Sequence, residues 1–506
     1  MRFIQVLFAS CLFTLAQLLT SAPAHAKWLR GETQNFIVYS SGNAQQLQDY
    51  AATLERFNAL IRSNFGITSA PSSSKLIIYF LENATEVDQL LSGRRGNVAG
   101  FYSSDNEGSY AVANRQRAGS VLDLNGMTVL LHEYMHHFMF RNFNYAYPPW
   151  YVEGFAEYYS TAQFKLDGNW ALGKAAQHRA YGLRSEARLP IEQILTSDLS
   201  KLNAEQLDLF YGRSWLLVHM LTEKPEFKGK LTAYFSAIQS SKTEAEAARS
   251  VFGDLRLLDR ALNSYRDGKL TYHTSLQPIK ADTAMRVTEL DEVADKMVML
   301  HLQRITHRSV DKTRKDLRAL AAAQPARAEV WYELALSERD LPKGAPQADV
   351  DAADRRAEAA LDSALAANPR YPRANVIKAY LLMDRLRAAG TTTAAPWTKA
   401  RSYLVTANAE AVNDPMVLVA WYDSYPMQGR PPTKTARDAL ARAFELEPEI
   451  TEVRIKYAFD LADQGEFDNA IRLVEFLARD PHRPEQGKAV LAQLTELKAA
   501  AAAAKK

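Results

Sequence analysis

The first part of the chain combines short apolar runs with one amphipathic pattern. Four runs rich in β-branched and aromatic residues have the composition of strands. They lie at residues 35–39, 75–80, 100–102 and 110–113. Residues 44–65 place apolar side chains at helical spacing, and from residue 127 onward nearly every apolar pattern is helical. Strands followed by helices predict an α+β domain rather than a βαβ arrangement.

Residues 311–506 are rich in Ala, Leu, Glu and Arg and predict helical hairpins. Helices are expected to end at Pro325, Pro369, Pro448 and Pro481. The last two prolines are 33 residues apart, close to the tetratricopeptide (TPR) period of about 34. Within this interval, residues 465–471 resemble the loop and second helix of a TPR unit. We therefore expect TPR-like repeats, with an irregular helical bundle as the alternative.

The first 26 residues have the pattern of a secretory signal peptide. Arg2 precedes an apolar run, and Ala24-His25-Ala26 has the small residues of a cleavage site. An uncleaved membrane anchor is the alternative. Cys11 is the only cysteine, so cleavage after Ala26 would leave a chain without disulfides. We expect a periplasmic or secreted bacterial protein with no stable membrane insertion, because no later segment reaches 18 apolar residues.

Composition and charge narrow the picture further. A chain of 506 residues is long enough for about three domains. Lys plus Arg number 61 against 58 for Asp plus Glu, a balance that disfavours a nucleic-acid partner. We divide the chain into a signal peptide (1–26), an α+β domain (27–270), a connecting helical segment (271–310) and helical repeats (311–506).

The segment His132-Glu133-Tyr134-Met135-His136 carries the clearest chemical signal. On a helix, positions i and i+4 lie on one face about one turn apart. Both imidazoles can therefore reach one zinc ion at about 2 Å. Glu133 lies about 100° round the helix, where a carboxylate can take a proton from the metal's water and pass it to a leaving amine. Ligand type favours Zn²⁺, although manganese, cobalt or iron fit the same residues.

A second segment, Trp-Tyr-Val-Glu-Gly-Phe-Ala-Glu-Tyr at residues 150–158, makes a family resemblance specific. Together the two segments resemble the gluzincins, zinc metallopeptidases that include thermolysin and the zinc aminopeptidases. The peptidase MA-like bacterial families, several with C-terminal helical repeats, are the most similar. The resemblance covers about residues 28–270. It implies a zincin-like fold with His132, His136 and Glu153 as zinc ligands and Glu133 as the base. The 16 residues between His136 and Glu153 are slightly fewer than in the aminopeptidases.

Further site residues are expected around this motif. Glu157, one turn after Glu153, is placed to accept a hydrogen bond from the first histidine, or lies on a solvated face. A peptidase also needs a donor to the developing oxyanion, for which the candidates are Tyr211 and, less favoured, His219. Both are aromatic residues on an apolar helix and have a core role as the alternative.

Two other features have structural expectations. His137 is about 100° round the helix from His136 and is expected to pack or hydrogen-bond rather than to bind metal. By analogy with zincins, residues 110–113 are expected to form the edge strand that pairs with an extended substrate.

Two functional hypotheses follow. The first is a secreted zinc peptidase that acts on a peptide or protein substrate, with repeats that recruit the substrate or a protein partner. The alternative is a periplasmic TPR-type adaptor whose zincin domain is structural or inactive. Glu133 favours the enzyme, because a purely structural zinc site does not need a base. Neither a glycine-rich phosphate loop nor a Gly-x-Ser-x-Gly elbow is present, so nucleotide hydrolysis and serine-esterase chemistry lack support.

Overall fold

The computed structural model describes residues 27–70, 74–91, 99–116, 125–143, 145–165, 167–184, 189–196, 198–240, 242–481 and 484–504. The expected signal peptide, with Cys11, lies outside these residues. Within the described ranges, no helix combines the length and apolar character needed to cross a membrane.

A six-stranded mixed sheet organises the N-terminal region, in the order β4-β5-β3-β2-β1-β9. Its strands are β1 (Leu29–Glu32), β2 (Phe36–Ser40), β3 (Leu76–Leu81), β4 (Gly100–Asp105), β5 (Gly108–Asn114) and β9 (Arg286–Glu289). All four predicted strands are confirmed. Because β2 and β3 are parallel and joined by helix α2 (Ala44–Asn64), they form a βαβ unit, and the prediction that excluded one was wrong. The region is therefore α/β.

The position of β5 also corrects an expectation. β5, which contains residues 110–113, pairs with β3 on one side and β4 on the other. Among the described strands, the two edges of this sheet are β4, next to β5, and β9 at the opposite end. The sequence did not distinguish β4 from β5 because both are short, apolar and bounded by turn residues.

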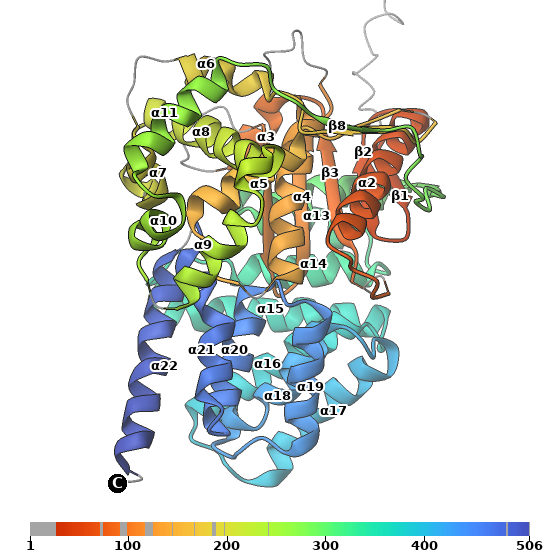
Figure 1. The fold of residues 1–506 in the computed structure, drawn as a ribbon. Helices are drawn as coiled ribbons and strands as arrows, with labels where there is room; N and C mark the ends of the chain where they lie inside the picture. Colours follow the sequence, from red (N-terminus) through yellow and green to blue (C-terminus); the bar gives the residue numbers. More distant parts are fainter. Residues whose placement is uncertain are drawn as a thin grey trace, which may run out of the picture.

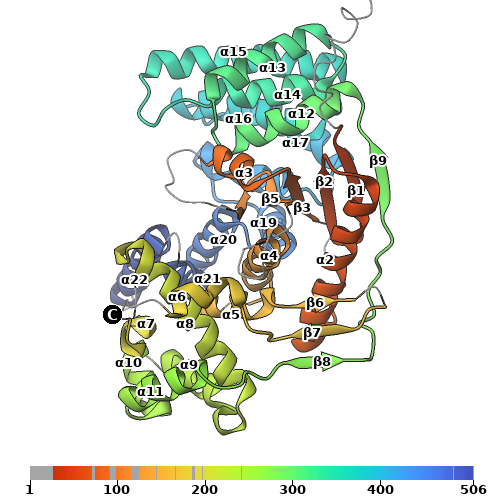
Figure 2. The same ribbon diagram turned by 90° about the horizontal axis from the view of Figure 1, so that it is seen from above.

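Both faces of the large sheet are buried, because successive side chains of β3 point alternately into two different apolar cores. Ile78 and Phe80 join the core formed with α2, α4 (Gly126–Asn142) and α5 (Pro149–Ser160). Tyr79 and Leu81 point to the opposite face, where they pack with α3 (Ala84–Leu90) and with α12 (Glu292–Ile305). Figure 2 shows these layers in succession, from α12 through the sheet to α2 and α4.

A second, three-stranded sheet has the order β6-β7-β8. Its strands are β6 (Gln163–Phe164), β7 (Trp170–Leu172) and β8 (His273–Ser275). The segment 271–310, expected to be helical, therefore contributes β8 to this sheet and β9 to the large sheet before it forms α12. These strands escaped prediction because each is only two to four residues long.

The other helices of the N-terminal region complete its core. They are α6 (Ala180–Arg184), α7 (Ile191–Thr196), α8 (Ala204–Glu223), α9 (Lys230–Gln239), α10 (Glu244–Phe252) and α11 (Leu255–Arg266). Among them, α8 packs directly on α5 and so lies next to the predicted site.

The C-terminal region consists of antiparallel helices, as predicted. They are α13 (Val310–Ala323), α14 (Ala328–Arg339), α15 (Gln347–Ala367), α16 (Pro372–Ala388), α17 (Ala394–Glu410), α18 (Pro415–Asp423), α19 (Lys434–Leu446), α20 (Thr451–Asp463), α21 (Phe467–Glu475) and α22 (Pro484–Ala504). Helices α13, α15 and α19 each end two residues before a predicted proline stop. Proline disfavours helical backbone at the residue before it, which explains this agreement.

Two contacts join the helices of the second half of the chain, counted from α12, to the N-terminal region. In the first, Val298 and Leu302 of α12 pack on the large sheet, and the Arg304 guanidinium donates to both oxygens of Glu107 in the β4–β5 turn at 2.8 and 2.7 Å. In the second, Arg141 of α4 donates to Glu449, which precedes α20. Figure 1 shows α18–α22, in blue, below α4 and the sheet.

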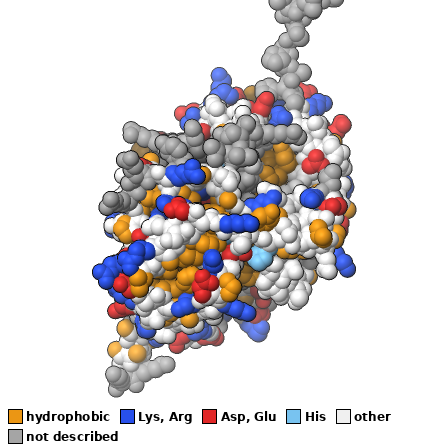
Figure 3. All heavy atoms as spheres, turned by 45° about the horizontal axis from the view of Figure 1, so that its top comes forward, with side chains coloured by type: hydrophobic (Ala, Val, Ile, Leu, Met, Phe, Trp, Pro, Cys, Tyr) orange, Lys and Arg blue, Asp and Glu red, His pale blue; other side chains and the backbone are white. Residues whose placement is uncertain are grey.

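Charged side chains of both signs are intermixed over the face of the molecule in Figure 3. Orange apolar side chains lie between them. This distribution fits the balanced composition and shows no extended basic surface on the described part of that face.

The segment between α19 and α20 makes stability depend on pH. Burial raises the pKa of Glu447 from 4.5 to about 7, and the neighbouring Glu449 carboxylate adds to the rise. The folded protein therefore binds this proton more tightly than the unfolded chain. Protonation of Glu447 therefore stabilises the folded state. The free energy of unfolding falls as pH rises from about 4.5 to 7 and this stabilisation is lost, and it stays lower at higher pH.

Glu447→Gln should raise the free energy of unfolding at pH 8 by up to about 3 kcal/mol and change it little at pH 4. Denaturant unfolding at the two pH values measures the difference. Glu445→Gln, at an exposed position near the end of α19, is the control. Equal effects of Glu447→Gln at both pH values would contradict the assignment.

Candidate metal centre

Helix α4 carries the first segment of the predicted site into the core. It begins after Asn125, whose side-chain oxygen accepts a hydrogen bond from the Thr128 N–H at 2.8 Å. Gly126 lies so close to β5 that an added Cβ would be 1.7 Å from the Asn114 carbonyl oxygen. Glycine at this position therefore sets how closely the helix approaches the sheet.

Helix α5 carries the second segment and starts at Pro149, a residue suited to the first helical turn. Gly154 faces α8, and an added Cβ would be 2.4 Å from the Ser214 carbonyl oxygen. The absence of a side chain at Gly154 lets α5 and α8 pack at short distance. As a result, residues of α8 reach the neighbourhood of Glu153.

His132, His136 and Glu153 converge on one point between α4 and α5. The two Nε2 atoms are 3.0 Å apart. Glu153 Oε2 lies 3.3 Å from His132 Nε2 and 3.6 Å from His136 Nε2. The side chains are deeply placed, because Glu153 is 0% exposed and His136 is 4% exposed.

These separations fit a tetrahedral metal. Zinc bonds of about 2.0–2.1 Å place neighbouring ligand atoms about 3.3–3.4 Å apart in a tetrahedron. The three observed separations fall around this value. Two imidazole nitrogens and one carboxylate oxygen are also the donor set of catalytic zinc sites that keep a fourth position open. The residues present therefore fit a bound zinc ion.

Glu157 lies behind this cluster and holds His132 from its other side. A Glu157 oxygen is 3.3 Å from His132 Nδ1, and the same carboxylate pairs with Arg179 and with His178 Nε2, the latter at 3.0 Å. Burial alone would raise the pKa of Glu157, but the Arg179 charge and the two histidine contacts outweigh it and hold the pKa well below its ordinary value. An ionised Glu157 fixes the orientation of the His132 ring.

Burial alone would lower the pKa of His132. Its contacts with Glu153 and Glu157 outweigh burial and raise that pKa to about 10. A metal ion that binds His132 must therefore displace a proton from it.

Glu133 lies beside the cluster, in a cleft. Its Oε2 accepts a hydrogen bond from the backbone N–H of Tyr102 on edge strand β4, at 3.1 Å. Glu133 and His136 both line this cleft, which has a volume of about 410 Å3. A larger groove of about 730 Å3 lies over α2 and β6, away from these residues. Glu133 thus shares this cleft with His136, one of the three converging residues, and a small molecule in the cleft can reach it.

The two oxyanion candidates have different surroundings. The Tyr211 ring on α8 lies 6.3 Å from the His132 ring and 4.9 Å from the Arg179 guanidinium carbon. Burial and the nearby carboxylates raise the pKa of Tyr211 well above its ordinary value, so its hydroxyl keeps its proton and can donate. His219, in contrast, is 0% exposed and uses Nε2 and Nδ1 in bonds to the Gly173 carbonyl and the Tyr265 hydroxyl.

His137 has a structural environment, as expected. Its Nδ1 lies 3.2 Å from the Tyr102 hydroxyl, and its ring stacks on Tyr134. Burial lowers the pKa of His137 to about 4, so the ring is neutral at pH 7. It lies on the side of α4 that faces Glu449 and the C-terminal helices.

Sequence reasoning missed three residues around the site. His178 and Arg179, in the short helical turn Gln177–Arg179, hold Glu157, while Tyr102 holds Glu133 through its backbone. An adjacent His-Arg pair was the only available signal for the first two. No side-chain pattern could reveal a backbone contact.

A second group of potential ligands is an ion-pair cluster. Glu107, His301 and Glu333 lie close together. Arg304 occupies the space between the carboxylates, with Nε 2.5 Å from Glu333 and both Nη atoms on Glu107. A guanidinium that already neutralises both acids excludes a metal ion from the same position.

A scan of known protein families and a search of curated proteins find no match to this chain. The functional argument therefore depends on the geometry of the site.

The ligand assignment predicts a clear order of metal affinities. Protein purified from residue 27 onward should contain about one zinc per chain, and the double variant His132→Ala/His136→Ala should contain none. Glu157→Gln should weaken zinc binding about 10–100-fold, and Glu153→Gln should weaken it more because it replaces a ligand. Metal analysis and competition with a chelator measure both effects, and the reverse ranking would exchange the two roles.

Proposed function

We propose that this protein is a secreted zinc-dependent peptidase of the gluzincin type, with a zincin-like catalytic region and TPR-like helices. One observation carries the proposal: the nitrogens of His132 and His136 and an oxygen of Glu153 converge at 3.0–3.6 Å, with a second carboxylate, Glu133, in the adjoining cleft. The expected resemblance to peptidase MA-like proteins adds support from the sequence.

Each residue has a defined task in this proposal. A zinc ion bound by His132, His136 and Glu153 would activate a water molecule and polarise the scissile carbonyl. Glu133 takes the proton of the attacking water and delivers it to the leaving amine. Tyr211 keeps its hydroxyl proton and donates a hydrogen bond to the carbonyl oxygen as negative charge develops. Glu157 fixes the His132 ring.

The alternative, an adaptor with an inactive zincin-like domain, has less support. Glu133 has no role in a structural metal site, yet it lies at the cleft beside the ligand atoms. Glu449 before α20 and Arg304 of α12 both contact the N-terminal region, so part of the surface that would recruit a partner is already used. Recruitment of substrate or partner by the remaining helices is compatible with the peptidase.

Glu133→Gln tests the general base. The amide keeps the shape of the side chain but cannot accept the proton, so turnover should fall about 10²–10⁴-fold while zinc content stays unchanged. Cleavage of reduced, carbamidomethylated ribonuclease A, an unfolded protein, followed by mass spectrometry measures the rate. Full activity of the zinc-loaded variant would exclude Glu133 as the base.

Tyr211→Phe tests the oxyanion donor. Loss of one such donor should lower kcat about 10²–10³-fold with little change in KM, because the bond forms chiefly in the transition state. Tyr265→Phe is the matched control, since the Tyr265 hydroxyl bonds His219 rather than the site. Equal activities of the two variants would assign Tyr211 to packing alone.

A further inference from the structure

The cleft beside Glu133 is lined by residues of the N-terminal region and by residues of the C-terminal helices. One wall consists of Tyr102 and Ser104 of edge strand β4 together with His136 of α4. The same cavity is also lined by Thr451 at the start of α20 and Gln486 on α22. Residues more than 300 positions apart in sequence thus border the same cavity.

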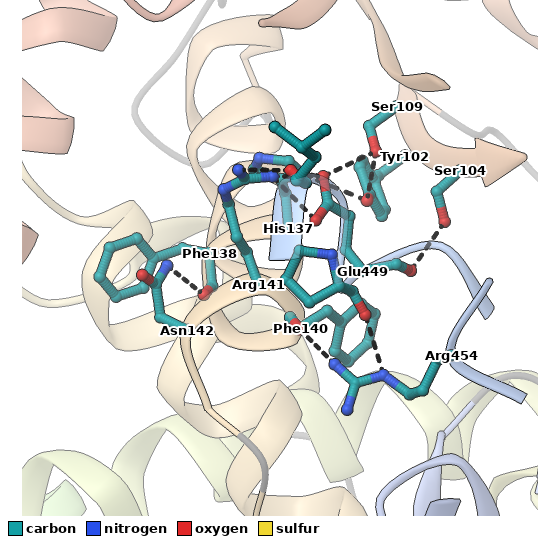
Figure 4. A network of polar contacts seen from close by, with 12 residues as sticks. Tyr102, Ser104, Ser109, His137, Phe138, Phe140, Arg141, Asn142, Glu449 and Arg454 are labelled. Atoms are coloured by element: carbon teal, nitrogen blue, oxygen red, sulfur yellow. Dashed lines mark hydrogen bonds and ion pairs between the residues drawn. The ribbon is translucent and has the colours of Figure 1, made fainter. Parts of the chain in front are cut away.

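Glu449 fixes the C-terminal wall to the elements that carry the site (Figure 4). Both carboxylate oxygens of Glu449 accept hydrogen bonds from Arg141 at 2.9 Å, and one also accepts a bond from Ser109 of β5 at 3.2 Å. The Glu449 carbonyl oxygen accepts a bond from Ser104 on β4. Glu449 is 5% exposed, so this contact is shielded from water and from screening by salt.

A second contact holds the same wall near the metal-binding face of α4. The Phe140 ring packs edge-on against Phe476, with centroids 4.9 Å apart. Arg454, 0% exposed, donates a hydrogen bond to the Phe140 carbonyl oxygen at 3.0 Å. Phe140 itself lies one turn after His136, and their rings stack. The wall is therefore seated directly beside a metal-binding residue.

We propose that the helices from α20 to α22 form the second wall of the substrate cleft and restrict this protein to extended segments of unfolded polypeptide. This inference rests on the proposed peptidase function and specifies the physical state of its substrate. The helical region is then part of the catalytic unit rather than only an arm that recruits partners.

The dimensions and burial of the site support this restriction. A scissile carbonyl must come within about 3–3.5 Å of its reaction partners. Yet His136 and Glu153 are 4% and 0% exposed, and the cavity that His136 lines is about 410 Å3. An extended strand needs only about 4.8 Å of space beside its neighbour in a sheet. Backbone within a folded protein is flanked by its own neighbours and cannot enter such a cleft.

Gln486→Trp tests the wall without disturbing the core. Gln486 is exposed on α22 and lines the cleft, so a larger side chain there narrows it. Gln493→Trp, about two turns further along α22, is the matched control because Gln493 is exposed but does not border the cavity. Circular dichroism and zinc content should be unchanged in both variants.

Binding is measured in the Glu133→Gln background, where cleavage does not interfere. Fluorescently labelled ribonuclease A is offered in two forms, native and reduced with carbamidomethylated cysteines, which share one sequence. Fluorescence anisotropy should give a Kd at least about tenfold lower for the unfolded form. Adding Gln486→Trp should weaken that binding at least about tenfold, and adding Gln493→Trp should not.

Equal binding of the two forms, no binding of either, or equal effects of the two tryptophan variants would overturn the inference. The proposed function is tested separately with Glu133 intact. Binding with the expected pattern but no cleavage of the unfolded form by zinc-loaded protein would overturn the peptidase and leave the binding cleft.

Discussion

The structure depends on the burial of one carboxylate between two imidazoles. Glu153 is 0% exposed, and an ionised carboxylate in such a position is costly unless a positive charge compensates it. His132 and His136 are the groups that face it, at distances that suit a shared metal ion. Helices α4 and α5 must therefore be held in one fixed relation. Gly126 lets α4 pack closely on β5, and Gly154 lets α5 pack closely on α8, so each helix is held by its own neighbour.

A chain of polar contacts around this cluster holds its side chains in place. Glu157 contacts the outer nitrogen of His132 and is itself held by Arg179 and His178. The Arg179 guanidinium also lies over the Tyr211 ring, so a single cation links the orientation of a histidine to the position of a candidate hydrogen-bond donor. Such outer contacts restrict the movement of side chains whose chemistry depends on small distances.

The C-terminal helices are joined by ion pairs to the helix and the strands that carry this cluster. Arg141 lies on the helix that carries both histidines, and its pairing with Glu449 joins that helix to the turn before α20. A second cation, the buried Arg304 of α12, joins the β4–β5 turn to α14 through Glu107 and Glu333. Paired buried charges of this kind set the register of one element against another, because a shift would leave a charge without its partner.

The sequence by itself determined much of the local structure and chemistry. Apolar periodicity located α2 and the four strands near residues 35–113, and proline positions located the ends of α13, α15 and α19, because these features depend on neighbouring residues. The spacing of His132 and His136 placed two imidazoles on one face for the same reason. Only the tertiary structure decided the parallel pairing of β2 and β3, the edge position of β4, and the meeting of Gln486 with His136 across one cleft. These depend on packing between segments distant in sequence, which no local pattern encodes.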